Sequence, residues 1–240
     1  MAQARIDNEP GFVLHSYPFR ETSLVVEVFT RHHGRMALVA RGARRPRSAL
    51  RGQVQPFTPL LLSWFGKSEV RTLHGAEWQG GLAPLAGMPL LCGFYLNELL
   101  LKLLARDDPH EALFDYYQAT LGELAELAEN NLERVLRRFE RHLLSEIGYA
   151  ATFHEEAETA LPVREGQAYY FVPERGPYAD GGTGGGIQVS GQTLLDMEQD
   201  RFESPVTRAE AKQLMRALIN HHLGGKPLYT RQMLKELIEK

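Results

Sequence analysis

The chain has 240 residues, of which 43% are hydrophobic and 24% charged, and its formal net charge is −3. This length and apolar content suffice for one large or two ordinary domains with buried cores. The single cysteine, Cys92, excludes a disulfide framework and a multi-cysteine zinc site within one chain, and we expect it to be buried. Because no signal peptide and no run of about 18 apolar residues is present, we expect a soluble, cytoplasmic protein.

The first part of the chain is predicted to form β-strands. Short runs rich in Val, Leu and Phe, separated by turn-forming residues, favour strands at 11–17, 23–30, 35–41, 54–64 and 69–74. Five short strands of this kind are typical of a small closed or nearly closed barrel. Pro56 and Pro59 interrupt the fourth run, and because proline lacks a backbone N–H we expect them at an edge or a bulge.

From about Pro89 the apolar residues recur with the period of a helix. The pattern predicts helices at residues 89–104, 109–128 and 131–147. The first is apolar around most of its circumference, which indicates a centrally buried helix. In the third, Asn131 is a candidate N-cap and Gly148 is placed to end the helix.

Residues 151–191 do not follow the helical period. Within them, Tyr169–Val172 and Ile187–Val189 have strand-like composition and could pair as a hairpin. The loop between these strands would contain the glycine-rich residues 181–186. This region is therefore predicted to be a hairpin or loop insertion.

Helices are expected to resume after Thr207, because Thr207 and Glu210 have the spacing of a capping box. The fold class that follows is α+β. A β-barrel domain is predicted at residues 1–80, and a mostly helical domain with the insertion is predicted at residues 81–240.

The stretch from Val28 to Ser68 contains no Asp or Glu in forty-one residues. Its basic residues are Arg31, Arg35, Arg41, Arg44, Arg45, Arg47, Arg51 and Lys67. The stretch thus carries +8, so the remainder of a chain with net charge −3 carries −11. Such polarisation indicates a polyanionic partner. A nucleic-acid backbone is suitable because Lys and Arg release its counterions when they neutralise phosphates.

Residues Arg41–Gly52 have the composition of a long loop between strands. Gly42 and Gly52 permit tight turns, and Pro46 prevents regular backbone pairing. The planar guanidinium group matches phosphate geometry, so we favour nucleic-acid binding over the alternative of a solvated charged loop. The neighbouring aromatic residues are Phe29, Phe57, Trp64 and Phe65. For each of these we favour burial in the barrel core over stacking on bases.

Three arginines, Arg134, Arg137 and Arg141, share one face of the predicted third helix through their three- and four-residue spacing. An arginine face bordered by apolar residues could hold an acidic peptide with a hydrophobic end. The residues alone favour a different interpretation, a solvated face that pairs with Glu133 and Glu140.

Signals for catalysis are weak. The chain contains no His-Glu-x-x-His, no phosphate-binding Gly-x4-Gly-Lys-Ser/Thr and no Gly-x-Ser-x-Gly motif. Adjacent histidines such as His221 and His222 are expected to point apart, and the segment His154–Glu158 is more simply a solvated acidic turn than a metal site. We therefore predict no enzymatic activity, no metal and no cofactor.

Several short motifs occur in a fixed order along the chain. They are Gly11-Phe-Val-Leu-His-Ser, His33-Gly-Arg, Val39-Ala-Arg-Gly-Ala-Arg-Arg, Gln55-Pro-Phe-Thr-Pro-Leu, Tyr95-Leu-Asn-Glu-Leu-Leu, Leu136-Arg-Arg-Phe-Glu, Gly148-Tyr and Gly224-Gly-Lys-Pro-Leu. With them the sequence resembles the RecO family of bacterial recombination mediators over nearly its whole length. Only residues 151–191 match poorly.

This resemblance implies an N-terminal OB barrel followed by a helical domain. It also implies binding of single- and double-stranded DNA, annealing of strands coated with single-strand binding protein (SSB), and assistance to RecA loading together with RecR. By position it assigns DNA binding to Arg35, Arg41, Arg44, Arg45, Arg47 and Arg51. It assigns binding of the acidic C-terminal tail of SSB to Arg137, with Arg134 and Arg141 beside it.

Some members of the family carry a four-cysteine zinc module in the region equivalent to residues 151–191. This region has no cysteine here, so we predict no structural zinc. Two alternative functions stay open: an RNA-binding OB adaptor and, with less support, a metal-dependent nuclease.

Overall fold

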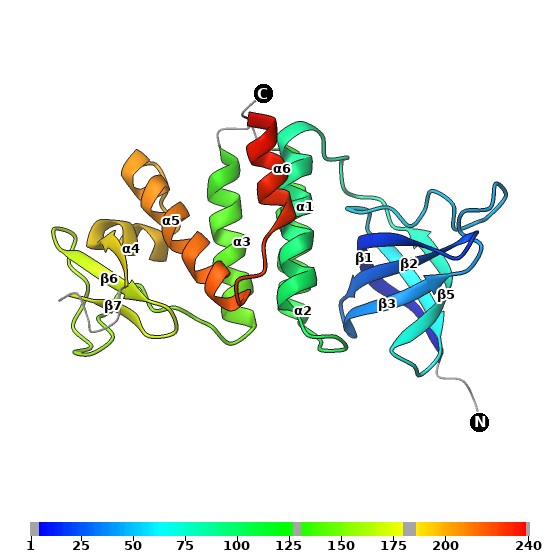
Figure 1. The fold of residues 1–240 in the computed structure, drawn as a ribbon, viewed down its shortest axis with the longest axis horizontal. Coiled ribbons are helices and arrows are strands. Elements are labelled where there is room, and N and C mark those ends of the chain that lie inside the picture. The colour runs from blue at the N-terminus through cyan, green and yellow to red at the C-terminus, as the bar shows by residue number, and fades with distance from the viewer. Residues whose placement is uncertain (1–4, 127–130, 180–185, 239–240) are drawn as a thin grey trace. The chain divides into compact units, whose positions relative to one another are not determined.

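The computed structural model describes residues 5–126, 131–179 and 186–238. The chain divides into two compact units, Met1–Leu127 with Leu228–Lys240 and Ala128–Pro227, and Figure 1 labels most of their elements. The first unit holds a β-barrel with helices α1, α2 and α6, and the second holds a small sheet with helices α3, α4 and α5. No helix within the described residues is long and apolar enough to cross a membrane.

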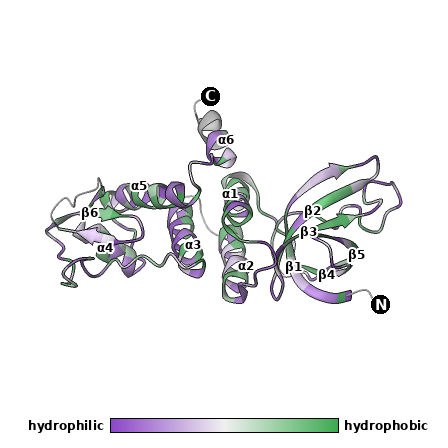
Figure 2. Cartoon of the chain, turned by 60° about the horizontal axis from the view of Figure 1, so that its bottom comes forward, coloured by the Kyte–Doolittle hydropathy of each residue, from purple (hydrophilic) through white to green (hydrophobic). Residues whose placement is uncertain are grey.

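The barrel consists of β1 (Arg5–Phe19), β2 (Ser23–Thr30), β3 (Gly34–Ala40), β4 (Leu60–Phe65) and β5 (Val70–Trp78). It is closed, with the order β1-β2-β3-β5-β4, and β3 and β5 are its parallel pair. This is the arrangement of an OB barrel, which confirms the predicted fold class. Apolar side chains of the strands fill the interior, and β2 and β3 are largely in the hydrophobic colour in Figure 2.

Strand β1 is longer than the predicted 11–17 because two irregularities let it bend. Its register shifts between Ile6 and Glu9 and again between Val13 and His15. Such bulges increase local twist and curvature, so one strand pairs with β2 along part of its length and with β4 along another. The barrel closes through this double pairing.

Strand β4 begins at Leu60, so the predicted start at residue 54 is wrong. Pro56 makes only an isolated bridge to Val13, and Pro59 immediately precedes the strand. Because proline has no backbone N–H, it cannot continue a ladder on both sides. Both prolines therefore lie outside the central strands, as expected, but not at the predicted edge or bulge.

Within the first unit, the bulge in β1 is hydrogen-bonded to α1 (Gly87–Leu103) and through it to α2 (Glu111–Glu126). The Leu14 carbonyl accepts a hydrogen bond of 2.9 Å from Asn97 Nδ2, and the Tyr117 hydroxyl donates to Asn97 Oδ1 over 2.5 Å. All three residues are buried, and burial raises the pKa of Tyr117, which keeps its hydroxyl a neutral donor. As expected for a central helix, Cys92 on α1 is buried as well.

Glu98 of α1 binds the first turn of α6 (Tyr229–Ile238). Its carboxylate accepts hydrogen bonds from the backbone N–H groups of Tyr229 at 2.8 Å and Thr230 at 2.9 Å, and from Thr230 Oγ1 at 2.6 Å. Lys102 completes the site at 3.0 Å. A buried carboxylate thus satisfies N–H groups that have no partner within α6 and complements the positive end of its dipole.

The second unit contains α3 (Leu132–Glu146), β6 (Ala168–Val172), β7 (Gly176–Tyr178), β8 (Ile187–Ser190), α4 (Gly191–Glu198) and α5 (Pro205–His222). The strands form a sheet in the order β7-β6-β8, so the predicted pairing of β6 with β8 is confirmed. Strand β7 on the other edge of β6 was not predicted. Most of the glycine-rich loop expected at 181–186 lies outside the described residues.

The predicted helix caps have different outcomes. Asn131 occupies the N-cap position of α3, as expected, but its side chain makes no capping hydrogen bond. Helix α5 starts at Pro205, because Ser204 is the N-cap and accepts from the Thr207 N–H, whereas Thr207 is buried and donates its hydroxyl to Asp196. Gly148, with φ of 89°, ends α3 as expected.

The Glu98 cap predicts a pH-dependent contribution to stability. Burial by itself would raise the pKa of Glu98, but hydrogen bonds from Thr230 and Tyr229 and the pair with Lys102 outweigh it, so the pKa is lowered from its ordinary 4.5. The stabilisation is therefore complete above pH 4.5 and is lost as pH falls through the lowered pKa.

We expect Glu98→Gln to reduce the free energy of unfolding by about 1–3 kcal/mol at pH 7, measured by urea denaturation. The difference from the unsubstituted protein should shrink in acid. Glu77→Gln, at an exposed position on β5, is the control and should change stability by under about 0.5 kcal/mol. Equal stability of the two variants would contradict this role of Glu98.

Candidate nucleic-acid interface

The long loop between β3 and β4 begins with a series of turns from Arg41 to Gly52, which we call the arginine loop. Backbone bonds from Arg45 N to Gly42 O and from Arg51 N to Ser48 O close successive turns. Gly42 and Gly52 have φ values of 68° and 79°, a conformation that favours glycine, as the sequence predicted.

Apolar residues attach the arginine loop to the barrel. Ala43 and Leu50, together with Val54 just beyond the loop, belong to the buried core cluster. The Arg44 N–H donates to the Thr22 carbonyl over 2.9 Å, which ties the loop to the β1–β2 turn. With its apolar side chains turned inward, the loop presents its polar side chains to solvent.

Five arginines of the loop, Arg41, Arg44, Arg45, Arg47 and Arg51, are exposed. Among the residues that the structure describes, no carboxylate lies within ion-pairing distance of any of them. Arg44 and Arg51 each make one long hydrogen bond, 3.4 Å, to a backbone carbonyl. The loop therefore concentrates positive charge that no acidic side chain in this part of the chain neutralises.

Two other arginines of the acid-free stretch are in a different situation. Arg31 forms a two-pronged pair with Asp115 at 2.9 and 2.8 Å and lowers the pKa of that carboxyl. Arg35 is largely buried, pairs with Glu27 at 3.1 Å and donates to the Leu104 carbonyl at 3.1 Å. The assignment of Arg35 to DNA binding stays a prediction, but these contacts already occupy its guanidinium group.

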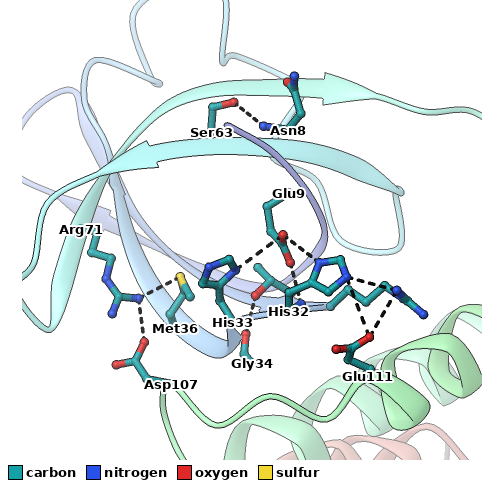
Figure 3. A network of polar contacts seen from close by, with 12 residues as sticks. Asn8, Glu9, His32, His33, Gly34, Met36, Ser63, Arg71, Asp107 and Glu111 are labelled. Carbon is teal, nitrogen blue, oxygen red and sulfur yellow. Dashed lines mark hydrogen bonds and ion pairs between the residues drawn. The ribbon is translucent and has the colours of Figure 1, made fainter. Parts of the chain in front are cut away.

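The histidines of the same stretch surround a buried carboxylate. Figure 3 shows Glu9 between His32 and His33, with Glu111 on the far side of His32. Glu9 accepts from the His32 N–H at 2.7 Å and lies 3.1 Å from His32 Nδ1 and 3.5 Å from His33 Nδ1. Since Arg31 and His32 both also approach Glu111 of α2, this part of the acid-free stretch already has acidic partners.

Arg20 is an exposed cation that the sequence pattern did not indicate. It lies in the β1–β2 turn, which the arginine loop contacts through Thr22, and its guanidinium is 5.1 Å from the ring centre of Phe19. Because Glu21 follows it directly, Arg20 falls outside the acid-free stretch and gave no sequence signal.

The aromatic residues near the loop separate into buried and accessible ones. Phe29 and Trp64 are both buried, as expected, but only Trp64 lies in the barrel core; Phe29 packs on Phe114 and Tyr117 of α2. Phe57 and Phe65 are only partly buried. Trp78, at the end of β5, is 68% exposed and was not among the predicted aromatics.

The arginine face of α3 differs from the predicted solvated arrangement. Arg134 is exposed, whereas Arg137 is buried and pairs with the buried Glu140 at 2.8 Å. Arg141 pairs with Glu198 and Asp200 at 3.4 Å each and donates to the Met197 carbonyl. The three arginines share a helix but not one environment. Their assignment to an acidic peptide stays a prediction.

One group of possible metal ligands occurs within the described residues, formed by Glu174, His221 and His222. Their ligand atoms lie within 4.8 Å of one another, although adjacent histidines were expected to point apart. The group is largely exposed, and the ring of Tyr149 stacks on His222 at 3.9 Å. The acidic segment at 154–158 forms no comparable group in this part of the chain.

An OB barrel with an exposed, arginine-rich loop is the architecture of a nucleic-acid-binding protein. The family model "Recombination protein O N terminal" matches residues 1–81, and "Recombination protein O C terminal" matches residues 89–232. The chain therefore belongs to the recombination protein O family.

Curated relatives match over nearly the whole chain. A protein of Thiobacillus denitrificans named DNA repair protein RecO is 62% identical, with 99% of this chain and 95% of the relative covered. Proteins of the same name from Nitrosospira multiformis and Paraburkholderia xenovorans are 54% and 55% identical to this chain. Each match covers 97% of this chain, and the matches cover 96% and 78% of the two relatives, respectively.

Replacing Arg44, Arg45 and Arg47 together with Ala is expected to weaken binding of single-stranded DNA of any sequence. The log–log dependence of affinity on salt should flatten by about 0.7 for each phosphate that the variant no longer neutralises, hence by up to about 2. Fluorescence anisotropy with a labelled oligonucleotide at several salt concentrations measures both the affinity and its salt dependence.

The matched control removes the same charge from exposed positions of the second unit, through Arg164→Ala, Arg175→Ala and Arg216→Ala. We expect its salt slope to stay close to that of the unsubstituted protein. Equal losses in the two triple variants would show that net charge, and not the loop, controls binding.

Proposed function

We propose that this protein is a DNA repair factor that binds DNA and anneals complementary strands during recombination. The observation that carries the proposal is the exposed arginine loop, which has no acidic partner within the described residues and projects from an OB barrel. Phosphate contacts from such a loop give affinity without sequence preference, as annealing of arbitrary strands requires.

The proposed mechanism uses binding free energy and no chemical step. Neutralising the phosphates of two complementary strands lowers their mutual repulsion, so they can approach and pair. The chain contains no nucleotide-binding motif, and annealing of this kind needs no ATP hydrolysis. We accordingly propose a non-enzymatic function, in which the protein acts on single-stranded DNA coated with SSB and, with RecR, assists RecA loading.

Delivery to coated DNA is proposed to use the arginines of α3. An acidic peptide tail would first meet the exposed Arg134, and Arg141 would exchange its carboxylate partners Glu198 and Asp200 for those of the tail. Arg137 is available to this site only if it shares its guanidinium with Glu140. Exchange of this kind costs little when the original pairs are partly exposed.

Two other functions are distinguishable by simple assays. An RNA-binding adaptor would favour RNA when matched DNA and RNA oligonucleotides compete, whereas we expect no preference for RNA. A metal-dependent nuclease could use the group of Glu174, His221 and His222. We expect no cleavage of labelled DNA in the presence of divalent ions.

Strand annealing is the direct test of the proposed function. We expect the protein to accelerate pairing of complementary strands both naked and coated with SSB, measured by fluorescence energy transfer between the strands. The variant with Arg44, Arg45 and Arg47 replaced by Ala should lose most of the acceleration on naked strands. An unaltered pairing rate in the presence of the unsubstituted protein would contradict the proposal.

A peptide titration tests the α3 site separately. We expect Arg134→Glu to weaken binding of an acidic, hydrophobic-ended peptide, because it places a negative charge on the exposed part of the site, and to leave binding of naked DNA within about twofold. Arg137→Gln should weaken peptide binding by about tenfold or more, as expected when a charged hydrogen bond is removed.

Thermal denaturation checks that Arg137→Gln, which alters the buried pair with Glu140, still folds. If Arg137→Gln does not fold, Arg134→Glu still tests the site, because Arg134 is exposed. If the folded variants bind the peptide as tightly as the unsubstituted protein, the assignment of peptide binding to α3 is wrong.

A further inference from the structure

A groove of about 610 Å³ lies in the first unit, beside the arginine loop. Its aromatic walls are Phe57 from the segment before β4, Trp78 from the end of β5 and Phe94 from α1. The other lining residues are Pro, Leu, Ala, Gly, Thr and Gln, so none of the groove is charged. It is an open surface suited to flat apolar groups that also carry hydrogen-bonding edges.

Trp78 contributes little to the core of the barrel. At 68% exposure it is the most exposed large apolar side chain within the described residues, in contrast to Trp64, which is 2% exposed. A largely exposed indole gains little of the free energy that burial provides, and its position at a groove indicates a binding surface. Phe94 is also accessible, at 37%.

Phe57 is held in an unfavourable backbone conformation at the same groove. Its φ is 64°, in the left-handed region that bulky residues rarely adopt. Its ring packs at 5.0 Å and 72° against Phe94. Gly93 makes room for it, because a Cβ at that position would lie 2.8 Å from the Phe57 ring. Strain of this kind persists where surrounding contacts enforce it, often at ligand sites.

The aromatic groove continues into a second groove of about 390 Å³. The two share Gly52, Gln55 and Pro56, and the second is lined by Arg44 and Arg51 of the arginine loop. No acidic residue lines either groove. A continuous surface that is aromatic at one end and cationic at the other matches a chain that carries flat rings and phosphates alternately.

We propose that the aromatic groove binds the unstacked bases of single-stranded DNA, with Trp78 as the stacking surface, while Arg44 and Arg51 hold the adjoining phosphates. This inference rests on the proposed DNA binding by the arginine loop. It adds that the aromatic groove distinguishes unpaired strands from paired ones. In a duplex the bases are stacked on one another and cannot reach the indole, whereas the phosphates can reach the arginines. The groove therefore favours single strands, and the loop binds both forms.

Tryptophan fluorescence tests the inference directly. We expect an oligothymidine strand to quench the emission of the unsubstituted protein, and a matched duplex to quench it far less. In Trp78→Phe only the buried Trp64 remains, so the strand should leave the emission nearly unchanged. Phenylalanine still offers a stacking face, and this variant should keep most of its affinity.

Anisotropy with labelled DNA supplies the affinity. Trp78→Ala should bind single strands roughly five- to 150-fold more weakly, the range expected when one base–aromatic stack is removed, and duplex within about twofold. Gly93→Ala, which changes no charge and no aromatic residue, should also weaken single-strand binding because it displaces Phe57 and Leu85, which both line the groove. Leu161→Ala, an exposed apolar site in the second unit, is the control and should bind like the unsubstituted protein.

The outcomes separate this inference from the proposed function. If Trp78→Ala keeps full affinity for single strands while the triple arginine variant is defective, the groove is not a base site, although the loop still binds DNA. If an acidic peptide quenches Trp78 and DNA does not, the groove is a peptide site and the inference is wrong. If the unsubstituted protein binds neither strand nor duplex, the proposed function fails as well.

Discussion

The pairing of β1 with both β2 and β4 is the constraint on which the first unit depends. A fifteen-residue strand can serve two neighbours only by bending, and its two bulges provide the bend. The bulge at Leu14 also frees a carbonyl, which Asn97 of α1 binds. Closure of the barrel thus depends on the two bulges of β1, and the bulge at Leu14 also contacts α1. The β3–β4 connection, which carries the arginine loop, is displayed on the scaffold that results.

The charge of the acid-free stretch is redistributed by the fold. In the sequence its arginines look equivalent, yet Arg31 meets Asp115, which is 84 residues away, and Arg35 meets Glu27. The five arginines of the arginine loop receive no such partner within the described residues. Unpaired surface cations repel one another and destabilise a compact state, so their concentration in one loop is understandable if a polyanion neutralises them. The groove with Trp78 adds uncharged, partly aromatic lining to this surface.

The second unit shows why identical spacing does not give identical roles. Arg134, Arg137 and Arg141 follow the helical period on α3, but helix α3 is packed on α5 in this unit, so some positions are buried and others are not. Arg137 pairs with Glu140 one turn away, and Arg141 is engaged by the end of α4 and the residue Asp200. Helical spacing predicts which side chains share a direction, and it does not predict which of them contact solvent.

Local patterns determined much of this protein: the strand and helix periods, the glycine turns of the arginine loop and the run of basic residues are all visible in the sequence, because each depends on residues close together in the chain. The α+β class and the OB barrel followed from them and from the family resemblance. Tertiary structure alone decided which arginines lack carboxylate partners, and that Trp78, Phe57 and Phe94 meet at one groove. Those outcomes depend on contacts between distant segments, which no local pattern encodes.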